Sequence, residues 1–284
     1  MPIRNSSPGF TRVKNPADRK CVVHFTGLGY KLIVVQLGLY IDRIVSGVHE
    51  WRDHESQLSV WLMDDIRLAY ISTPKVASSS IRNLIRERQA SILHRDYEGK
   101  SNKLRNRIDW RIKASLSPSL AQNLKDKYYV FSFVRNPLTR LYSCYRDKVI
   151  KMATRRERCG LSRFGIEFGM RFDDFVARVA AIPDDQADQH LRSLHTFLTY
   201  QGTSLVHWLG RVERLDSDWQ HLTTRFGLPC PQHDRRVSGP SVSFANLPYT
   251  RKTAQIAIER YQQDIEMFGY QREADELLVS LPRA

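Results

Sequence analysis

Short apolar runs alternate along the chain with segments whose apolar residues recur at helical spacing. Residues 66–72 (IRLAYIS) are apolar and rich in strand formers, and residues 128–135 (YYVFSFVR) are apolar on both faces, a pattern typical of a buried parallel strand. After each run the apolar positions change to a helical repeat, at 81–93 and at 138–152. The pattern therefore predicts two units of strand, tight loop and helix.

The rest of the chain continues this alternation. The pattern predicts a helix at 172–181, a strand within 204–215, a helix at 217–226 capped by Ser217, a loop at 228–249 and a long helix at 250–268. The basic stretch 95–127 is typical of a solvated helix and loop, whereas the apolar run 32–41 predicts a core strand or a buried helix. Alternating strands and helices indicate an α/β fold, with a central, mostly parallel sheet flanked by helices. We expect a flexible segment at 1–20 and a single domain at 21–284.

Composition narrows the function without selecting one. Apolar residues make up 42% of the 284 residues, which excludes a disordered chain and allows a sizeable core. The formal net charge of +14 would attract nucleic acid, anionic lipid, sulfated glycans or phosphate-rich nucleotides. The four cysteines show no metal-ligand spacing, and we expect Cys144 to be a buried free thiol. Without a membrane-spanning run or a signal-peptide pattern, the sequence predicts a cytoplasmic protein.

The loop at 73–80 (TPKVASSS) joins the first predicted strand to its helix. Such a loop presents free backbone N–H groups and the positive end of a helix dipole. Lys75 and the three serine hydroxyls add charge and further donors without bulk, so the loop fits a phosphate or sulfate group. A serine-capped helix with a surface lysine is the alternative. The loop has no glycine and departs from the GxxxxGK[ST] pattern, which argues against ATP hydrolysis.

The second predicted unit carries an arginine at the end of its strand. Arg135 follows the apolar run, and Ser143 lies about two turns into the next helix. A guanidinium supplies a bidentate fork and a serine supplies one more donor, so the two side chains could clasp one phosphate. Taken alone, an arginine at a strand end also fits a structural or exposed role.

Together the two units resemble a known pair of nucleotide-binding motifs. PKVASSSI (74–81) and FVRNPLTRLYSCY (133–145) are similar to the motifs of carbohydrate sulfotransferases, in particular the branch of chondroitin, dermatan and heparan 2-O-sulfotransferases. Three more segments match weaker signatures of that family: ADQHLRSLHTFL (187–198), LGRVERLDSDWQHL (209–222) and RYQQDIEMFGY (260–270). Leu191 stands where the family usually has an aromatic residue. The resemblance covers residues 67–270.

The resemblance implies a P-loop-like sulfotransferase fold and a nucleotide donor. That donor is 3′-phosphoadenosine-5′-phosphosulfate (PAPS), which leaves as 3′,5′-adenosine bisphosphate. Seven residues would grip the 5′-phosphosulfate end: Pro74, Lys75, Val76, Ala77, Ser78, Ser79 and Ser80. Arg135 and Ser143 would hold the 3′-phosphate. The implied acceptor is a hydroxyl of a carbohydrate, and an anionic polysaccharide or oligosaccharide would match the basic balance of the chain.

The reaction needs a donor for the leaving oxygen and a base for the acceptor. Lys75 is the natural partner of the bridging oxygen, where negative charge grows. Histidine suits the role of base near neutral pH. The family match favours His190, with Asp188 two positions away; His94 is second and Glu213 third, although Glu213 in its strand better fits the orientation of other groups. No metal is expected.

Other functions remain open from the sequence. The basic residues Arg105, Arg107, Arg111 and Lys113 and the cluster 151–158 would line an acceptor groove or form solvated faces. The rivals to a sulfotransferase are a P-loop-like nucleotide kinase and a basic nucleic-acid-binding protein, but no zinc pattern, RNA-binding aromatic signature or helix-turn-helix supports the latter. The animal relatives carry an N-terminal membrane anchor and act in the Golgi, whereas this sequence shows no anchor, so we expect a soluble protein. The oligomeric state stays open.

Overall fold

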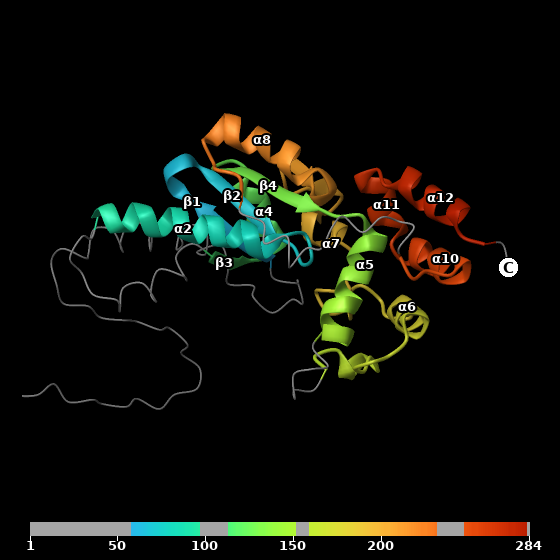
Figure 1. The fold of residues 1–284 in the computed structure, drawn as a ribbon. Helices are drawn as coiled ribbons and strands as arrows, with labels where there is room; N and C mark the ends of the chain where they lie inside the picture. The colour runs from blue at the N-terminus through green and yellow to red at the C-terminus, as the bar shows by residue number, and fades with distance from the viewer. Residues whose placement is uncertain (1–57, 97–112, 152–158, 232–246, 283–284) are drawn as a thin grey trace, which may run out of the picture. The chain divides into compact units, whose positions relative to one another are not determined.

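The computed structural model describes residues 58–96, 113–151, 159–231 and 247–282 (Figure 1). These residues belong to one compact unit of the chain. Several expectations fall on residues outside these ranges: the segment 1–20 and the domain boundary after it, the run 32–41, most of the loop 228–249, most of the cluster 151–158, and Arg105, Arg107 and Arg111.

A five-stranded sheet forms the centre of the described residues. The strands lie in the order β3-β1-β2-β4-β7. Strands β2, β4 and β7 pair in parallel, while β1 pairs antiparallel with both β2 and β3. Strand β3 therefore runs with the parallel set, and four of the five strands point the same way. The predicted α/β class with a mostly parallel sheet is confirmed. The strand bounds are β1 Leu58–Met63, β2 Leu68–Ser72, β3 Lys113–Leu116, β4 Tyr129–Val134 and β7 Trp208–Arg211.

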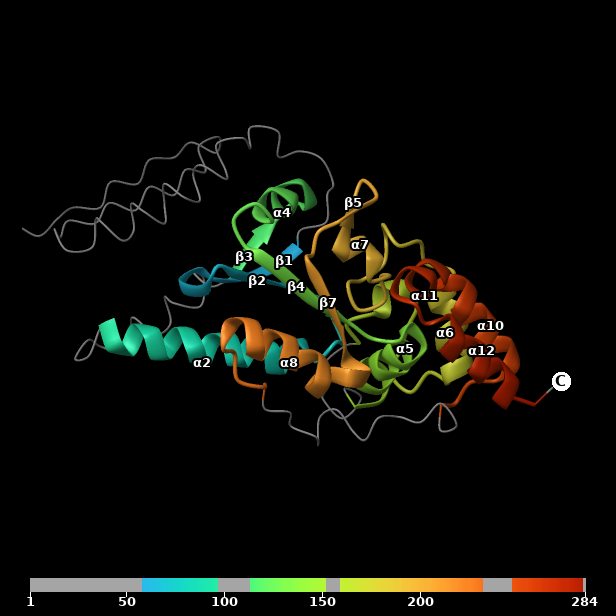
Figure 2. The same ribbon diagram turned by 90° about the horizontal axis from the view of Figure 1, so that it is seen from above.

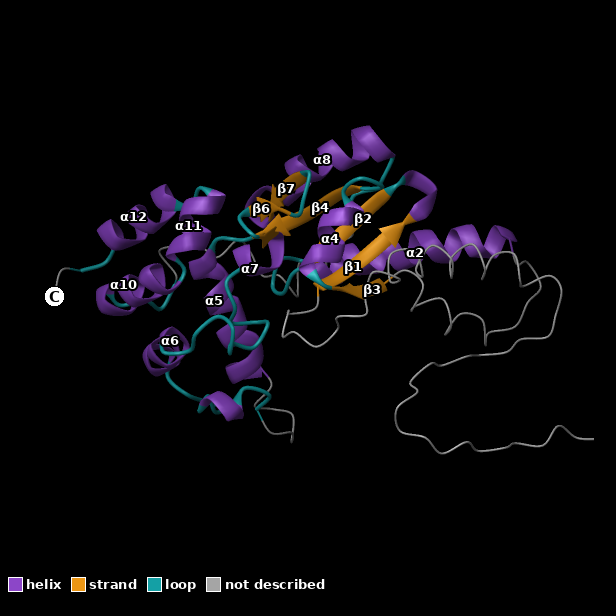
Figure 3. Ribbon diagram, turned by 180° about the vertical axis from the view of Figure 1, so that it is seen from behind, coloured by secondary structure: helices purple, strands orange, loops and turns teal. Residues whose placement is uncertain are grey.

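Helices cover both faces of this sheet, and further helices lie beyond one end of its strands. Helices α2 and α8 lie on one face and α4 lies on the other (Figure 2), and the view from behind shows the same layers (Figure 3). The remaining helices gather beyond the carboxyl ends of the parallel strands (Figure 1). The helix bounds are α2 Ser78–Asp96, α4 Pro118–Leu124, α5 Pro137–Tyr145, α6 Phe172–Ala180, α7 His195–Leu198, α8 Leu215–Phe226, α10 Arg251–Arg260, α11 Gln262–Phe268 and α12 Gln271–Ser280.

Aromatic packing joins β4 to its neighbours. The ring of Phe133 stacks on Trp219 of α8 at 5.7 Å between centroids, and Tyr70 of β2 stacks on Phe131 at 5.1 Å. Burial of such rings is the main source of stability in this layer. Gly210 of β7 leaves room for the Phe133 ring, because a Cβ atom at position 210 would lie only 2.3 Å from that ring.

Two sequence-based boundaries are wrong because tertiary contacts set them. The stretch 95–127 contains strand β3, which pairs with β1 at the sheet edge, and helix α4, whose N-cap is Ser117. Strand β3 has only four residues, which are too few for an alternation of apolar and polar side chains to be recognised. The helix predicted at 217–226 begins at Leu215 instead, and the Ser217 hydroxyl donates to the Arg214 carbonyl rather than capping the helix.

The long helix predicted at 250–268 is divided in two. Its backbone leaves helical geometry at Tyr261, with φ −113° and ψ 23°, between α10 and α11. Tyr261 is buried, and its hydroxyl donates to the Leu191 carbonyl at 2.7 Å. A further helix, α12, follows at the C-terminus and was not predicted. A contact with a distant loop therefore accompanies the break, and the local apolar period does not reveal it.

Candidate active site

The two predicted phosphate-binding elements lie at the carboxyl ends of two neighbouring inner strands of the sheet. Strands β2 and β4 are parallel neighbours, so the loop after β2 and the arginine after β4 both follow carboxyl ends, where α/β sheets usually bind ligands. Thr73 is buried, and its hydroxyl donates to the Phe133 carbonyl at 3.2 Å. This bond ties the start of the first element to the end of β4.

Residues 73–80, called the donor loop after their predicted role, have a strained backbone with free amides. Lys75 (φ +67°) and Ala77 (φ +58°) both adopt the left-handed conformation, which costs about 1–2 kcal/mol for each non-glycine residue. Within the described residues, the N–H groups of residues 75–79 have no hydrogen-bond acceptor. Successive free N–H groups at the start of a helix form a concave site for an anion. The Val76 side chain is buried, so only its backbone can face a ligand.

Lys75 reaches from the donor loop to the end of α5. Its Nζ lies 3.0 Å from Asp147 Oδ2, and 16% of its side chain is exposed. Asp147 belongs to a π-helical turn, Arg146–Ile150, that continues α5. Such turns are rare in proteins, and many of those that occur lie at functional sites. Burial raises the pKa of the Asp147 carboxyl, but the hydrogen bond and charge of Lys75, with Lys148 and His190, outweigh burial and lower that pKa.

Arg135 lies between β4 and the N-cap of α5. Its Nε donates to Thr139 Oγ1 at 3.2 Å, and no carboxylate of the described residues lies within 4.0 Å of it. Burial lowers the pKa of the Arg135 guanidinium, while the nearby Glu213 and Tyr270 act in the opposite direction. Ser143 is half-buried on the same helix, and its hydroxyl has no partner among the described residues. Both side chains are available to an anion.

Glu213 supports the Arg135 end of the site. One carboxylate oxygen accepts from the Asn136 backbone N–H at 2.8 Å, and the other accepts from the Tyr270 hydroxyl at 3.0 Å. Burial and the Glu213 charge raise the pKa of Tyr270 well above its ordinary value. Because both of its oxygens are engaged, Glu213 orients its neighbours rather than standing ready as a base.

His190 lies in a turn beside the Lys75–Asp147 pair. Its Nδ1 lies 2.6 Å from Asp188 Oδ1, and its backbone N–H donates to the same oxygen at 2.9 Å. Burial raises the pKa of Asp188, but the hydrogen bonds from His190 and the charges of His190 and Arg163 prevail and lower it. With Nδ1 bonded to a carboxylate, Nε2 is the nitrogen left to accept a proton.

The structure does not bring His94 to the donor loop. His94 lies in α2, whose first residue is Ser78. At 1.5 Å per residue, the sixteen intervening steps put its backbone about 24 Å along the helix axis from the loop. Lys113, another predicted acceptor contact, lies in edge strand β3.

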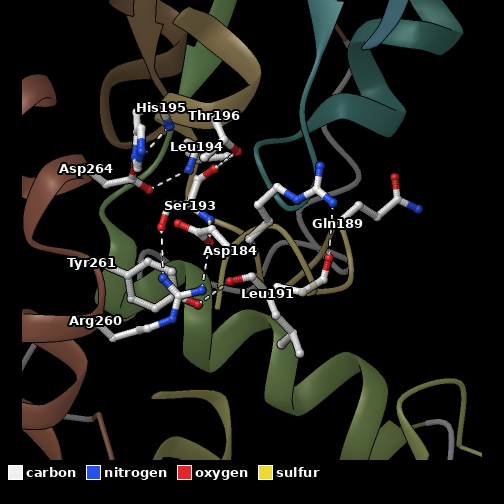
Figure 4. Close-up of polar contacts among 12 residues, drawn as sticks. Asp184, Gln189, Leu191, Ser193, Leu194, His195, Thr196, Arg260, Tyr261 and Asp264 are labelled. Atoms are coloured by element: carbon white, nitrogen blue, oxygen red, sulfur yellow. Dashed lines mark hydrogen bonds and ion pairs between the residues drawn. The ribbon is translucent and has the colours of Figure 1, made fainter. Parts of the chain in front are cut away.

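The C-terminal helices anchor the segment that carries His190. Asp264 is fully buried and accepts from the backbone N–H groups of Leu194 and His195, at 2.6 and 2.8 Å (Figure 4). Arg260 donates to Asp184 at 2.7 Å and to the Ser193 hydroxyl at 3.1 Å (Figure 4). In the sequence, Arg260 and Asp264 stood out only as part of the family signature at 260–270. That match did not reveal that they anchor the segment that carries His190.

Taken together, the fold and the site define an α/β protein in which a loop with free amides and an arginine follow the carboxyl ends of two neighbouring parallel strands. The family model of the sulfotransferase family matches residues 59–271, a range that includes the donor loop, Arg135 and His190. This chain therefore belongs to the sulfotransferase family. The predicted family and fold are confirmed, whereas the predicted branch of chondroitin, dermatan and heparan 2-O-sulfotransferases is not. No group of three or more His, Cys, Asp or Glu residues in the described ranges could hold a metal ion.

The relatives are vertebrate proteins of low identity. The chain is 24% identical over 229 residues to carbohydrate sulfotransferase 14 of Danio rerio, covering 73% of this chain and 60% of that protein. It is also 24% identical to carbohydrate sulfotransferase 14 of Mus musculus and of Homo sapiens, with 74% and 60% covered in each case. The chain thus spans about 60% of the length of these relatives. No solved structure matches it.

The predicted cytoplasmic location is wrong. The relatives are carbohydrate sulfotransferases, a class of Golgi enzymes that act on secreted glycans. The prediction rested on a missing apolar segment, and a missing segment does not determine a compartment. Within the described residues, no helix has both the length and the apolar character needed to cross a membrane.

Proposed function

We propose that this protein transfers a sulfuryl group from PAPS to a hydroxyl of a carbohydrate. The observation that carries the proposal is the donor loop, in which Lys75 and free amides stand at the start of α2. The loop follows β2, and Arg135, which has no carboxylate partner among the described residues, follows the neighbouring strand β4. Two cationic sites on neighbouring loops suit a nucleotide that is anionic at both ends.

The residues present fit such a donor. The amides of residues 75–79 and the hydroxyls of Ser78 and Ser80 would hold the 5′-phosphosulfate end. Arg135 and Ser143 would hold the 3′-phosphate. Beside Arg135, the side-chain Nδ2 of Asn136 is buried without a partner among the described residues, and it offers one more donor. When bound, PAPS supplies the sulfuryl group and leaves as 3′,5′-adenosine bisphosphate.

Lys75 would act on the leaving group. Negative charge grows on the leaving phosphate oxygen during sulfuryl transfer, as it does during phosphoryl transfer. A fixed ammonium group aimed at that oxygen stabilises the transition state more than the ground state. Asp147 holds Lys75 at 3.0 Å in the structure, which keeps the side chain at the mouth of the donor loop.

His190 would act on the acceptor. Asp188 holds Nδ1 of the ring, so Nε2 would take the proton of the attacking hydroxyl. A carboxylate on the far nitrogen fixes the tautomer and stabilises the imidazolium that forms. The charge of His190 lowers the pKa of Asp147, so the proposed base lies close to the Lys75–Asp147 pair.

A carbohydrate acceptor is supported by the named relatives. We propose that the acceptor is an anionic glycan, because the chain carries a net charge of +14. A positively charged protein attracts an anionic acceptor, whose charge offsets the repulsion among the basic side chains. Arg163, with 68% of its side chain exposed, lies 3.9 Å from Asp188 and offers a cation on the His190 side.

Incubation with labelled PAPS and three glycans tests this function. We expect the protein to label at least one of unsulfated chondroitin, chemically desulfated dermatan and desulfated heparan. Labelling should need intact Lys75. A protein that binds ATP in preference to the bisphosphate would be a kinase, and one that binds only nucleic acid would belong to another class; either result would contradict the proposal.

A further inference from the structure

Arg140 is a buried cation that has no countercharge among the residues that the structure describes. Only 1% of the residue is exposed, and no carboxylate of the described residues lies within 4.0 Å of its guanidinium. The guanidinium donates instead to three backbone carbonyls: Nε to Pro74 at 3.3 Å, and Nη2 to Gln189 at 3.4 Å and to Arg192 at 2.8 Å.

Burial of this charge works against stability. A buried guanidinium loses its hydration, and neutral carbonyls return only part of that free energy. Leu138, Leu141 and Cys144 of the same helix are buried and apolar, so the three carbonyls are the groups that compensate the charge of Arg140. What Arg140 adds beyond this compensation is the link between the segments that carry those carbonyls.

The three carbonyls belong to the two halves of the site. Pro74 directly precedes Lys75, and Gln189 directly precedes His190. A single planar group therefore joins the donor loop to the turn that carries the proposed base. Because a guanidinium has a rigid fork of donors, it fixes the distance between the loops, which a lysine ammonium on its flexible stem cannot do.

We propose that Arg140 is a positioning residue that holds the donor loop and the His190 turn in one fixed arrangement. Lys75 and His190 then act on the same transfer, one on the leaving oxygen and one on the attacking hydroxyl. The inference rests on the proposed function and extends it to a residue that touches neither donor nor acceptor.

Hydrogen exchange with 3′,5′-adenosine bisphosphate as the probe tests this role without an acceptor. In the natural protein, saturating bisphosphate should slow exchange in residues 73–80 and also in residues 187–192. In Arg140→Lys it should slow exchange in 73–80 alone. Slowed exchange in both segments of the variant would overturn the proposal. Absence of any effect on 73–80 in the natural protein would instead contradict the donor site itself.

Turnover gives a second readout with labelled PAPS. A misplacement of about 1 Å costs roughly a hundredfold in rate, so Arg140→Lys should lose about that factor in transfer to the best glycan of the panel. Release of free sulfate to water should persist, because Lys75 still faces the donor. Equal loss of transfer and hydrolysis would assign Arg140 a general structural role and overturn the proposal.

Arg251→Lys is the matched control. Arg251 also donates to a backbone carbonyl, that of Leu278 at 2.8 Å, but it joins α10 to α12. Its variant should keep both the transfer rate and the exchange pattern. Arg140→Gln, which removes the charge and retains one donor, replaces the lysine variant if that does not fold. If neither variant folds, Arg140 serves stability and the proposal fails.

Discussion

Lys75 and Asp147 form the ion pair at the centre of the proposed chemistry. The pair is partly exposed, with 16% and 43% of the side chains accessible, and such pairs add little to stability. Its consequence is orientation, since the pair holds a long side chain at the donor loop. The charge of Lys75 also keeps the pKa of Asp147 low against the effect of burial, so the carboxylate remains ionised at neutral pH.

The Lys75→Ala variant should lose turnover far more than donor affinity. The lysine meets charge that develops in the transition state, and loss of one such donor typically costs a hundredfold or more in rate. Steady-state kinetics and bisphosphate binding measure the two effects. Lys148→Ala is the control, because Lys148 lies 3.9 Å from the same Asp147 oxygen but outside the loop. Normal turnover with weakened PAPS binding would give Lys75 a ground-state role.

The His190→Ala variant should keep bisphosphate binding and lose roughly two to four powers of ten in turnover. Steady-state kinetics and bisphosphate binding of the two proteins measure these effects, with His94→Ala as the comparison. An inactive His94 variant beside an active His190 variant would refute the assignment.

At the scale of elements, the pairing of β4 with β7 is extended by the backbone and ring of His207. His207, before β7, donates its backbone N–H to the Val130 carbonyl at 2.7 Å. Its ring Nδ1 accepts from the Val130 N–H at 2.9 Å. Burial lowers the pKa of His207, and the charges of Lys125 and Arg225 add to that effect. Only the neutral ring can accept this hydrogen bond.

Stability should therefore fall in acid because of His207. The unfolded chain binds the proton at the ordinary pKa of about 6.5, and the folded form binds it only at lower pH. As the pH falls below about 6.5, protonation favours the unfolded state. His207→Gln should show a shallower loss of melting temperature between neutral and mildly acid pH. Identical pH profiles for the two proteins would contradict this account. The effect should be small, because most of the residue is exposed and only part of it is desolvated.

Helix α11 anchors the His190 segment through Asp264. Asp264→Asn replaces one accepting oxygen with a donor and opposes buried N–H groups. Hydrogen bonds to a charged group contribute about 1.5–3 kcal/mol each, so we expect a loss of at least that size in urea denaturation. Asp275→Asn on the exposed face of α12, where Gln271 donates to the carboxylate, should change stability little. Equal stability of the two variants would contradict the anchoring role.

At the scale of the molecule, the donor site draws on two crossovers of one sheet. The donor loop follows β2, the Arg135 clasp follows β4, and both meet α5. The His190 turn is joined to them through Arg140 of α5, and its next residue, Leu191, is held by Tyr261 between α10 and α11. A ligand that spans these parts should therefore stabilise the whole unit.

The 3′,5′-adenosine bisphosphate should stabilise the fold by about 2.7 kcal/mol at a hundredfold excess over its dissociation constant. Binding to the folded state alone produces this gain by mass action. A thermal-shift series measures it, with AMP as the control because AMP lacks the 3′-phosphate. Equal stabilisation by AMP would contradict the clasp by Arg135 and Ser143.

The sequence predicted the elements whose signals are local. Strands β2 and β4 were recognised by their apolar runs and α2 and α5 by their helical spacing, because these patterns arise from neighbouring residues. The break at Tyr261 and the edge strand β3 were missed, since both depend on contacts with distant segments.

The sequence by itself determined the family and placed the loop 73–80 and Arg135 directly after their strands, because motif spacing along one strand–loop–helix unit does not depend on the rest of the fold. Only the tertiary structure decided which residues meet. Lys75 pairs with Asp147 across 72 positions, and Arg140 reaches Pro74 across 66. Those contacts follow from the order of strands in the sheet and the packing of helices at its end, and no local period of a sequence encodes that order.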